Sequence, residues 1–275
     1  MKIKKALLFV PPALTFQNNL DINPVPPLGL AYIGAVLEKM GLEVKIYDCL
    51  IEGWDNRREV KPGIVQIGVT PDEIRRQIVE FNPDIVGVNN LFSRQRKNAH
   101  SIYALAKEVN PNIITVAGGA HPTVMSDLVL QDKNVDFVVL GEGEVTVRNL
   151  VEHLEGKRSL DDVDGIAFRK NGEIKIAPKK TFIENLDEIP FPAWNLLNFT
   201  KYFGLKLSHG KRRHKAFAPI ITSRGCPAGC SFCTAHHVWG RGYRCRSAEN
   251  VIDEMRQLKN NYGIKELLCE DDNTT

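Results

Sequence analysis

The chain of 275 residues lacks any apolar run that approaches the roughly 18 residues needed to span a bilayer. Three lysines stand in residues 1–5, but the apolar run between them and Pro11 is too short for a signal peptide. A strong charge of one sign is also lacking, because 36 basic and 33 acidic residues leave a net charge of +3. We therefore expect a cytosolic (cytoplasmic) protein with no transmembrane segment and no nucleic-acid partner.

Motifs for phosphate recognition are equally scarce. No Gly-x-Gly-x-x-Gly follows the first predicted strand, which disfavours a dinucleotide, and no P-loop lysine follows a glycine-rich turn. The densest basic run, residues 211–215, has no interleaved aromatic side chains, so we interpret it as a solvated loop rather than a nucleic-acid patch. Intrinsic disorder is excluded because 43% hydrophobic and 25% charged residues are close to the globular average.

The amino-terminal part of the chain alternates between short apolar runs and amphipathic segments. The runs are continuous and rich in Val and Ile, as expected for strands buried on both faces of a parallel sheet: 6–10, 44–47, 85–88, 113–117 and 137–140. Five strand–helix units with short connections predict a Rossmann-like, doubly wound α/β domain over residues 1–160. Its ligand is expected outside the carboxyl ends of the strands.

Helix signals fall between these strands. Apolar residues recur at i, i+3, i+4 and i+7 in residues 102–109 and 147–154, which is typical of amphipathic helices. Thr70 is expected to cap a helix that begins at Pro71, with Glu73 returning a hydrogen bond as a capping box.

Glycine and small polar residues gather where the predicted strands end, and such residues let a backbone approach a ligand closely. Three of these loops together predict a binding edge for a large, flat ligand, with these candidate contacts: Asn90, Ser93, Gly118, Gly119, His121, Gly141, Glu142 and Gly143. His121 is a candidate axial metal ligand or hydrogen-bond donor. The plainer alternative is a turn residue before Pro122 that bonds to the backbone.

A bridge is predicted over residues 161–215. It begins with a β-hairpin in residues 164–176, where Asn171-Gly172 is the two-residue turn. Residues 177–214 are irregular, with several prolines and aromatics, and are expected to pack across a domain interface. A second domain is expected over residues 216–275.

The six cysteines are unevenly spaced, and a cytosolic chain of this length is not expected to hold a disulfide framework. Cys226, Cys230 and Cys233 follow a predicted strand in a Cys-x3-Cys-x2-Cys spacing. Three thiolates around a 4Fe–4S cluster leave one iron open to a further group. Zinc is the alternative, with the fourth ligand from His236 or His237, or a tetrad completed by Cys245 or Cys269. We favour the cluster because zinc sites usually pair two such knuckles.

The cysteine spacing, with Phe232 before the third cysteine, resembles the radical S-adenosylmethionine superfamily. The lead-in residues 223–226 and the sequence Asp271-Asp272-Asn273 resemble its cobalamin-dependent branch. The glycine loops upstream are similar to the cobalamin-binding domain of that branch. The resemblance covers essentially the whole chain.

The resemblance implies three cofactors: a 4Fe–4S cluster, S-adenosylmethionine and cobalamin. The three cysteines would hold the cluster, Phe232, Asp271 and Asp272 would contact S-adenosylmethionine, and the eight loop residues above would contact cobalamin. A donor such as flavodoxin or ferredoxin would supply the electron that cleaves S-adenosylmethionine. The resulting radical would abstract hydrogen from an unreactive carbon, to which methylcobalamin would deliver a methyl group.

The resemblance leaves several functions open. The first is methylation of an unactivated carbon in a small molecule or lipid precursor. The others are a radical cyclase of the tetrapyrrole type and a cobalamin-binding sensor or carrier without catalysis. A tRNA methylthiotransferase is disfavoured because only Cys49 precedes the cysteine loop. Cobalt is not expected to take a histidine from the first loop, which lacks the Asp-x-His-x-x-Gly motif.

The second domain is short for this superfamily. Only two strands are predicted in residues 216–275, whereas the superfamily's partial barrel has about six strand–helix units of roughly 30 residues each. We therefore expect these residues to form the beginning of a barrel, and either the chain is a fragment of a longer protein or the rest of the barrel comes from elsewhere. The 275 residues alone are expected to bind cobalamin but to catalyse poorly or not at all.

Overall fold

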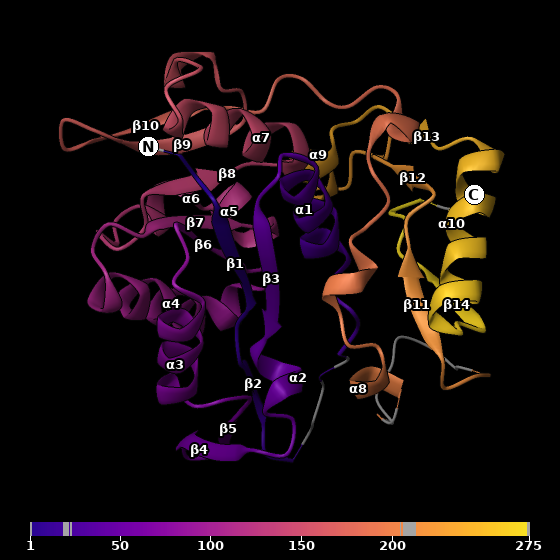
Figure 1. The fold of residues 1–275 in the computed structure, drawn as a ribbon, viewed down its shortest axis with the longest axis horizontal. Coiled ribbons are helices and arrows are strands. Elements are labelled where there is room, and N and C mark those ends of the chain that lie inside the picture. The colour runs from indigo at the N-terminus through magenta and orange to yellow at the C-terminus, as the bar shows by residue number, and fades with distance from the viewer. Residues whose placement is uncertain (1, 19–21, 23, 204, 206–212, 274–275) are drawn as a thin grey trace.

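The computed structural model describes residues 2–18, 22, 24–203, 205 and 213–273, so the basic run 211–215 lies partly outside the described residues. Figure 1 shows one large sheet of seven strands in the order β10-β9-β8-β7-β6-β1-β3. Five of its strands run parallel and match the five predicted runs: β1 (Lys5–Val10), β3 (Glu43–Asp48), β6 (Ile85–Asn89), β7 (Ile114–Gly118) and β8 (Phe137–Val139).

Helices cover both faces of this sheet. One face packs against α1 (Leu28–Lys39) and α7 (Gly143–Leu154), and the other against α3 (Pro71–Phe81) and α4 (Arg96–Val109). Successive residues of β1 alternate between the two hydrophobic clusters, which is why the strand is a continuous apolar run. The doubly wound α/β domain is therefore confirmed.

The strand order identifies where a ligand is expected. The chain runs from β1 outward to β3 on one side and then returns to β6 on the other. In doubly wound sheets this reversal leaves a crevice at the carboxyl ends of the two central strands. The loops that follow β1 and β6 therefore border the expected site.

The N-terminus of α3 forms only half of the predicted capping box. The Thr70 hydroxyl accepts a hydrogen bond from the Glu73 amide at 3.3 Å. The Glu73 carboxylate does not return to Thr70, because it accepts hydrogen bonds from Tyr47 on β3 and from Arg76 and Gln77 on its own helix. The expectation of a reciprocal cap was wrong, since tertiary contacts take the carboxylate.

The predicted hairpin is present and belongs to the large sheet. Strands β9 (Ile166–Lys170) and β10 (Glu173–Ala177) are joined by Asn171 and Gly172, which have φ angles of 55° and 84°. Both positive angles are typical of a type I′ turn. Because β9 pairs antiparallel with β8, the hairpin covers the edge of the parallel strands.

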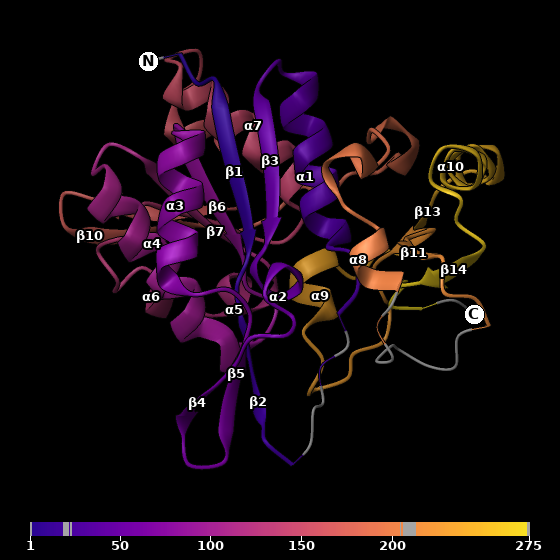
Figure 2. The same cartoon turned by 60° about the horizontal axis from the view of Figure 1, so that its bottom comes forward.

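A small antiparallel sheet was not predicted. It contains β2 (Ala13–Phe16), β5 (Ile64–Ile67) and β4 (Arg57–Lys61), and it projects beyond the carboxyl end of β1 (Figure 2). The other short elements of this region are α2 (Cys49–Glu52), η1 (Ser93–Gln95), α5 (Ala120–Val124), α6 (Ser126–Val129) and η2 (Leu160–Asp162).

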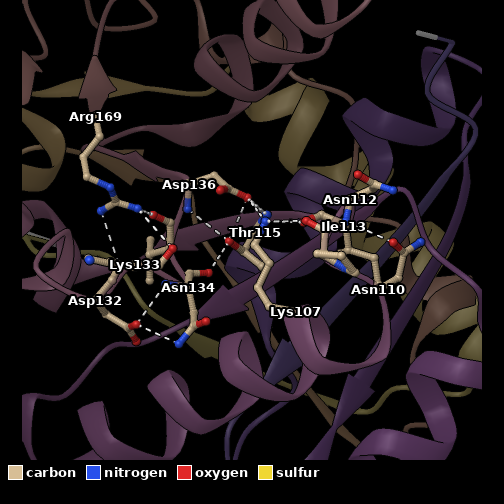
Figure 3. Close-up of polar contacts among 12 residues, drawn as sticks. Lys107, Asn110, Asn112, Ile113, Thr115, Asp132, Lys133, Asn134, Asp136 and Arg169 are labelled. Carbon is tan, nitrogen blue, oxygen red and sulfur yellow. Dashed lines mark hydrogen bonds and ion pairs between the residues drawn. The ribbon is translucent and has the colours of Figure 1, made fainter. Parts of the chain in front are cut away.

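The amino ends of the parallel strands are tied together by the polar network in Figure 3. The Asp136 carboxylate accepts hydrogen bonds from Lys107 Nζ at 2.6 Å and from the Thr115 amide at 2.8 Å. Arg169 donates to four backbone carbonyls of residues 130–135. These hydrogen bonds lie at the sheet edge opposite the expected ligand site. They stabilise the sheet and are not part of that site.

The C-terminal part is a strand–helix–strand unit, as predicted. Strands β11 (Phe217–Ile220) and β14 (Glu266–Cys269) are parallel and are connected through α10 (Ala248–Tyr262). Ser247 caps α10 by accepting a hydrogen bond from the Asn250 amide at 3.1 Å. A two-residue ladder pairs β12 (Ser223–Arg224) with β13 (Arg244–Cys245), and the described residues contain no closed barrel.

The part of the bridge that follows the hairpin packs between α1 and the C-terminal strand–helix–strand unit. It contains η3 (Leu186–Glu188), η4 (Trp194–Leu196) and α8 (Thr200–Phe203). Its Trp194 shares one hydrophobic cluster with Tyr32 of α1 and Leu258 of α10. Both views show α1 between the large sheet and the C-terminal strands. Among the described residues, no helix is both long and apolar enough to cross a membrane.

Candidate functional site

The predicted residues that follow β6 and β7 lie side by side at the carboxyl edge of the sheet. The Asn90 amide donates to the Gly118 carbonyl at 2.8 Å, and the His121 amide donates to the Asn90 carbonyl at 3.2 Å. The Ser93 hydroxyl lies 2.9 Å from Nδ1 of His121. The residues predicted from these two loops are therefore neighbours: Asn90, Ser93, Gly118, Gly119 and His121.

The two glycines of this edge differ in what surrounds them. A Cβ at Gly119, where φ is +105°, would lie 2.6 Å from Oδ1 of Asn89 and 2.8 Å from the Asn90 carbonyl. Only glycine accommodates this close backbone approach. A Cβ at Gly118 would meet nothing within 4 Å, so the backbone of this residue faces open space where a ligand can approach.

Two buried polar atoms at this edge have no hydrogen-bond partner. They are Nε2 of His121, a residue that is 4% exposed, and Oδ1 of Asn90, which is 2% exposed. Burial lowers the pKa of His121, with a smaller effect from the positive charges of Arg96 and His100, so the imidazole is neutral at neutral pH. An unpaired buried polar atom costs about 1–3 kcal/mol, and a ligand atom that reached either one would remove this cost.

The loop that follows β8 faces the C-terminal part instead. Gly141 has a φ of +65°, and a Cβ there would lie 2.9 Å from the Val238 carbonyl. The fully buried Glu142 carboxylate accepts hydrogen bonds from Arg244 at 2.8 Å, from Arg224 at 3.3 Å and from the Ile183 amide at 2.8 Å. Gly143 begins α7 directly behind it.

Arg224 is almost completely buried in this contact. Its side chain is 2% exposed, and its second terminal nitrogen lies 2.6 Å from the Glu144 carboxylate. Its guanidinium lies 5.2 Å from the Tyr32 ring centroid and 4.8 Å from that of Trp239. Burial alone would raise the pKa of Glu144, but the charge and hydrogen bond of Arg224 hold it below its usual value. The pair is therefore ionised at neutral pH.

The three cysteines lie in a loop that we call the cysteine loop, residues 225–243. All three are free thiols; Cys226 and Cys233 are half-buried and Cys230 is exposed. The Cys233 amide donates to the Cys230 carbonyl at 3.1 Å, and the Ala235 amide to Cys233 Sγ at 3.4 Å. No group of three His, Cys, Asp or Glu side chains in the described part of the chain is gathered as a metal site. Three accessible thiols within eight residues nevertheless form a donor set that suits an iron–sulfur cluster.

Asp271 and Asp272 lie at the carboxyl end of β14. Asp271 accepts hydrogen bonds from the Thr222 amide at 2.7 Å, the Thr222 hydroxyl at 2.5 Å and the Ser223 hydroxyl at 2.7 Å. Burial opposes ionisation, yet these bonds hold the pKa of Asp271 below its usual value. Burial and then the Asp271 charge raise the pKa of Asp272. Phe232, in the cysteine loop, is 88% exposed.

The two predicted regions face one another. Helix α9 (Ala235–Trp239), which ends the cysteine loop, contacts α5, which begins at the His121 turn. Figure 2 shows α9 beside the carboxyl edge of the large sheet. Sequence reasoning missed Arg244, Glu144, Tyr32 and Trp239, because only their tertiary contacts single them out.

Comparison with known proteins agrees with this architecture. The B12 binding domain family matches residues 23–151. Cytidylyl-2-hydroxyethylphosphonate methyltransferase of Streptomyces wedmorensis is 40% identical, over all of this chain and 56% of its own length. An anaerobic magnesium-protoporphyrin IX monomethyl ester cyclase of Rubrivivax gelatinosus is 32% identical, over 91% of this chain and 42% of its own. The chain thus spans about half the length of the curated relatives it matches.

Solved structures share the fold. OxsB, a cobalamin-dependent S-adenosylmethionine radical enzyme solved with aqua-cobalamin and S-adenosylmethionine, superposes with a TM-score of 0.73 at 21% identity, over 98% of this chain and 34% of its own. TsrM of Kitasatospora setae, a radical S-adenosylmethionine methyltransferase solved with cobalamin and a [4Fe-4S] cluster, superposes with a TM-score of 0.69 at 19% identity, over 99% and 48%.

Proposed function

We propose that the chain belongs to the cobalamin-dependent radical S-adenosylmethionine enzymes and that, on this premise, the protein it represents is a methyltransferase acting on carbon. The proposed cofactors are cobalamin, S-adenosylmethionine and a 4Fe–4S cluster. Flavodoxin or ferredoxin is the proposed type of electron donor.

One observation supports this proposal: the cysteine loop lies against the same sheet edge where Gly118 borders open space and where buried atoms of Asn90 and His121 lack hydrogen-bond partners among the described residues. A reaction that uses two cofactors on one carbon needs their sites to be adjacent. The contact between α5 and α9 supplies that adjacency.

Each group of residues has a separate proposed task. Asn90, Ser93, Gly118, Gly119 and His121 bind the corrin ring or its side chains through backbone and neutral polar groups. The three cysteines hold the cluster, with Phe232 against the adenine and Asp272 near the remaining polar groups of S-adenosylmethionine. When bound, these cofactors supply the electron, the radical and the methyl group, while the chain orients them and excludes water.

The relatives indicate the class of substrate. One methyltransferase that matches the whole chain is named for a cytidylyl-linked hydroxyethylphosphonate. A hopanoid C-3 methylase of Methylococcus capsulatus is 29% identical over 85% of this chain. We propose methylation of an unactivated carbon in a small molecule or lipid precursor.

The test is transfer of a labelled methyl group from S-adenosylmethionine, using the full-length protein with cobalamin, a reconstituted cluster and reduced flavodoxin. The phosphonate named above and a hopanoid are the trial substrates. Label recovered on substrate carbon supports the proposal. Cleavage of S-adenosylmethionine with no label on either substrate, but with ring closure of a porphyrin monomethyl ester, contradicts it.

That last outcome defines the second candidate, a radical cyclase. It is favoured by the 32% identity to the magnesium-protoporphyrin cyclase of Rubrivivax gelatinosus. A cyclase would cleave S-adenosylmethionine to a 5′-deoxyadenosyl radical and methionine, so the labelled methyl group would stay on the released methionine and the porphyrin product would remain unlabelled.

A further inference from the structure

The cysteine loop is anchored to the first domain by three buried charged residues, Arg224, Glu142 and Glu144, and by the half-buried Arg244. Its two ends are joined by the β12–β13 ladder, in which Arg224 is the direct partner of Arg244. Like charges placed opposite one another in a ladder destabilise it. Two guanidinium groups at the base of this loop therefore need compensating negative charge.

Glu142 and Glu144 supply that charge from the first domain. Glu142 contacts both arginines, at 2.8 and 3.3 Å, and Glu144 lies 2.6 Å from Arg224. The side chains of the two carboxylates are 0% and 8% exposed. The two arginines pair with the two carboxylates in one largely buried charged cluster, with Lys179 as a further basic group near both carboxylates. Removing one partner from such a cluster destabilises it, because a buried charge is then left uncompensated.

The backbone of the cysteine loop also approaches neighbouring segments closely, at two glycines. A Cβ at Gly225 would lie 2.1 Å from the Gly242 carbonyl, so the ends of the loop cross without space for a side chain. A Cβ at Gly141 would meet the Val238 carbonyl at 2.9 Å. The loop after β8 thus docks on both the base and the helix of the cysteine loop.

We propose that Glu142 and Glu144 are positioning residues that fix the cysteine loop on the carboxyl edge of the large sheet, and that they do not contact the corrin ring. This inference rests on the proposed function for the identity of the cofactors, but the docking itself does not. It differs from the sequence expectation for Glu142, which was a cobalamin contact. Arg224 lies two residues before Cys226. The cluster of charged side chains therefore fixes the position of the cysteine loop relative to the sheet edge.

The first measurement is hydrogen–deuterium exchange of the cofactor-free protein with Glu144→Gln. Loss of one buried carboxylate leaves Arg224 short of charge, so we expect amides of residues 225–243 to exchange about a hundredfold faster. Strands β1 and β6 should be unchanged. The matched control is Glu152→Gln, also on α7, whose carboxylate pairs with Arg158 at 2.9 Å within the first domain. This control should leave exchange in the loop unchanged.

The second measurement separates positioning from ligand contact. Titration with cobalamin, followed by its visible spectrum, should give an affinity for Glu144→Gln within about threefold of the unmodified protein, while the iron–sulfur absorbance after reconstitution falls. Arg244→Gln should behave in the same way, and Arg244→Lys should restore much of the iron–sulfur signal. A purely global loss of stability would not be rescued by lysine.

Two outcomes overturn the proposal. One is a tenfold or greater loss of cobalamin affinity with unchanged exchange in the loop, which would make the carboxylates corrin contacts. The other is unchanged exchange in the loop with unchanged affinity. If Glu144→Gln fails to fold, Arg244→Gln decides between the same outcomes from the other side of the contact. Because exchange is measured without cofactors, failure of the labelled methyl transfer leaves this result standing.

Discussion

Asp48 is expected to make the protein less stable as the pH rises from 4 to 6. Its carboxylate lies at the carboxyl end of β3, where it accepts hydrogen bonds from the amides of Leu50 and Ile51 and, at 2.8 Å, from the Tyr202 hydroxyl of the bridge. Burial raises the pKa of Asp48 to about 6, although these three bonds lower it. An unfolded aspartate titrates near 3.8.

The direction in which pH changes the free energy of unfolding depends on which state, folded or unfolded, holds the proton of Asp48. Below about pH 4 the carboxyl is protonated in both the folded and the unfolded state. Between about pH 4 and 6 the folded protein holds a proton that the unfolded chain releases, so the free energy of unfolding falls as pH rises. At about 1.4 kcal/mol per pKa unit, the difference between about 6 and 3.8 corresponds to about 3 kcal/mol. Above about pH 6 the loss is complete.

The assay is urea unfolding of the unmodified protein and of Asp48→Asn, followed by circular dichroism at several pH values. The free energy of unfolding of the unmodified protein minus that of Asp48→Asn should fall by about 2.4 kcal/mol between about pH 4 and 7, because the unfolded carboxyl is already partly ionised at pH 4. Asp55→Asn, which removes an exposed carboxyl, is the matched control for the substitution itself. A constant or rising difference for Asp48→Asn would refute the reasoning, because burial would then not govern the ionisation of this group.

Three further predictions concern the proposed cofactor sites. Cys226→Ala should abolish the iron–sulfur absorbance of anaerobically reconstituted protein and leave the cobalamin spectrum intact; loss of both, or of neither, would contradict the assignment. Gly119→Ala should lower the free energy of unfolding by about 1–3 kcal/mol, because alanine is strained at a φ of +105°, and urea unfolding that matches the unmodified protein would show that the turn relaxes. His121→Leu removes an unpartnered buried nitrogen, so cobalamin affinity should fall about tenfold without loss of stability. Calorimetry of both properties checks this, and a destabilised variant with unchanged affinity would assign His121 a structural role.

Local patterns in the sequence were sufficient to predict many of the strands and turns of this protein. Continuous apolar runs predicted five parallel strands, and the Asn171-Gly172 pair predicted the hairpin turn, because both depend on residues near one another in the chain. The Cys-x3-Cys-x2-Cys spacing likewise indicated the proposed cluster loop. The small sheet of β2, β4 and β5 escaped prediction, since β4 has no buried residue and so carries no apolar run.

Other features arise only when distant segments meet. The sequence named Glu142 and the Arg224 lead-in separately, but nothing local indicated that they form one buried cluster with Glu144 and Arg244. Arg224 and Glu144 are 80 positions apart, and their pairing depends on how the bridge returns the chain to the sheet edge. The sequence alone predicted which loops bind cofactors. Only the tertiary structure showed which of these loops face one another, because ion pairs between residues far apart in the chain produce no repeating pattern in the sequence.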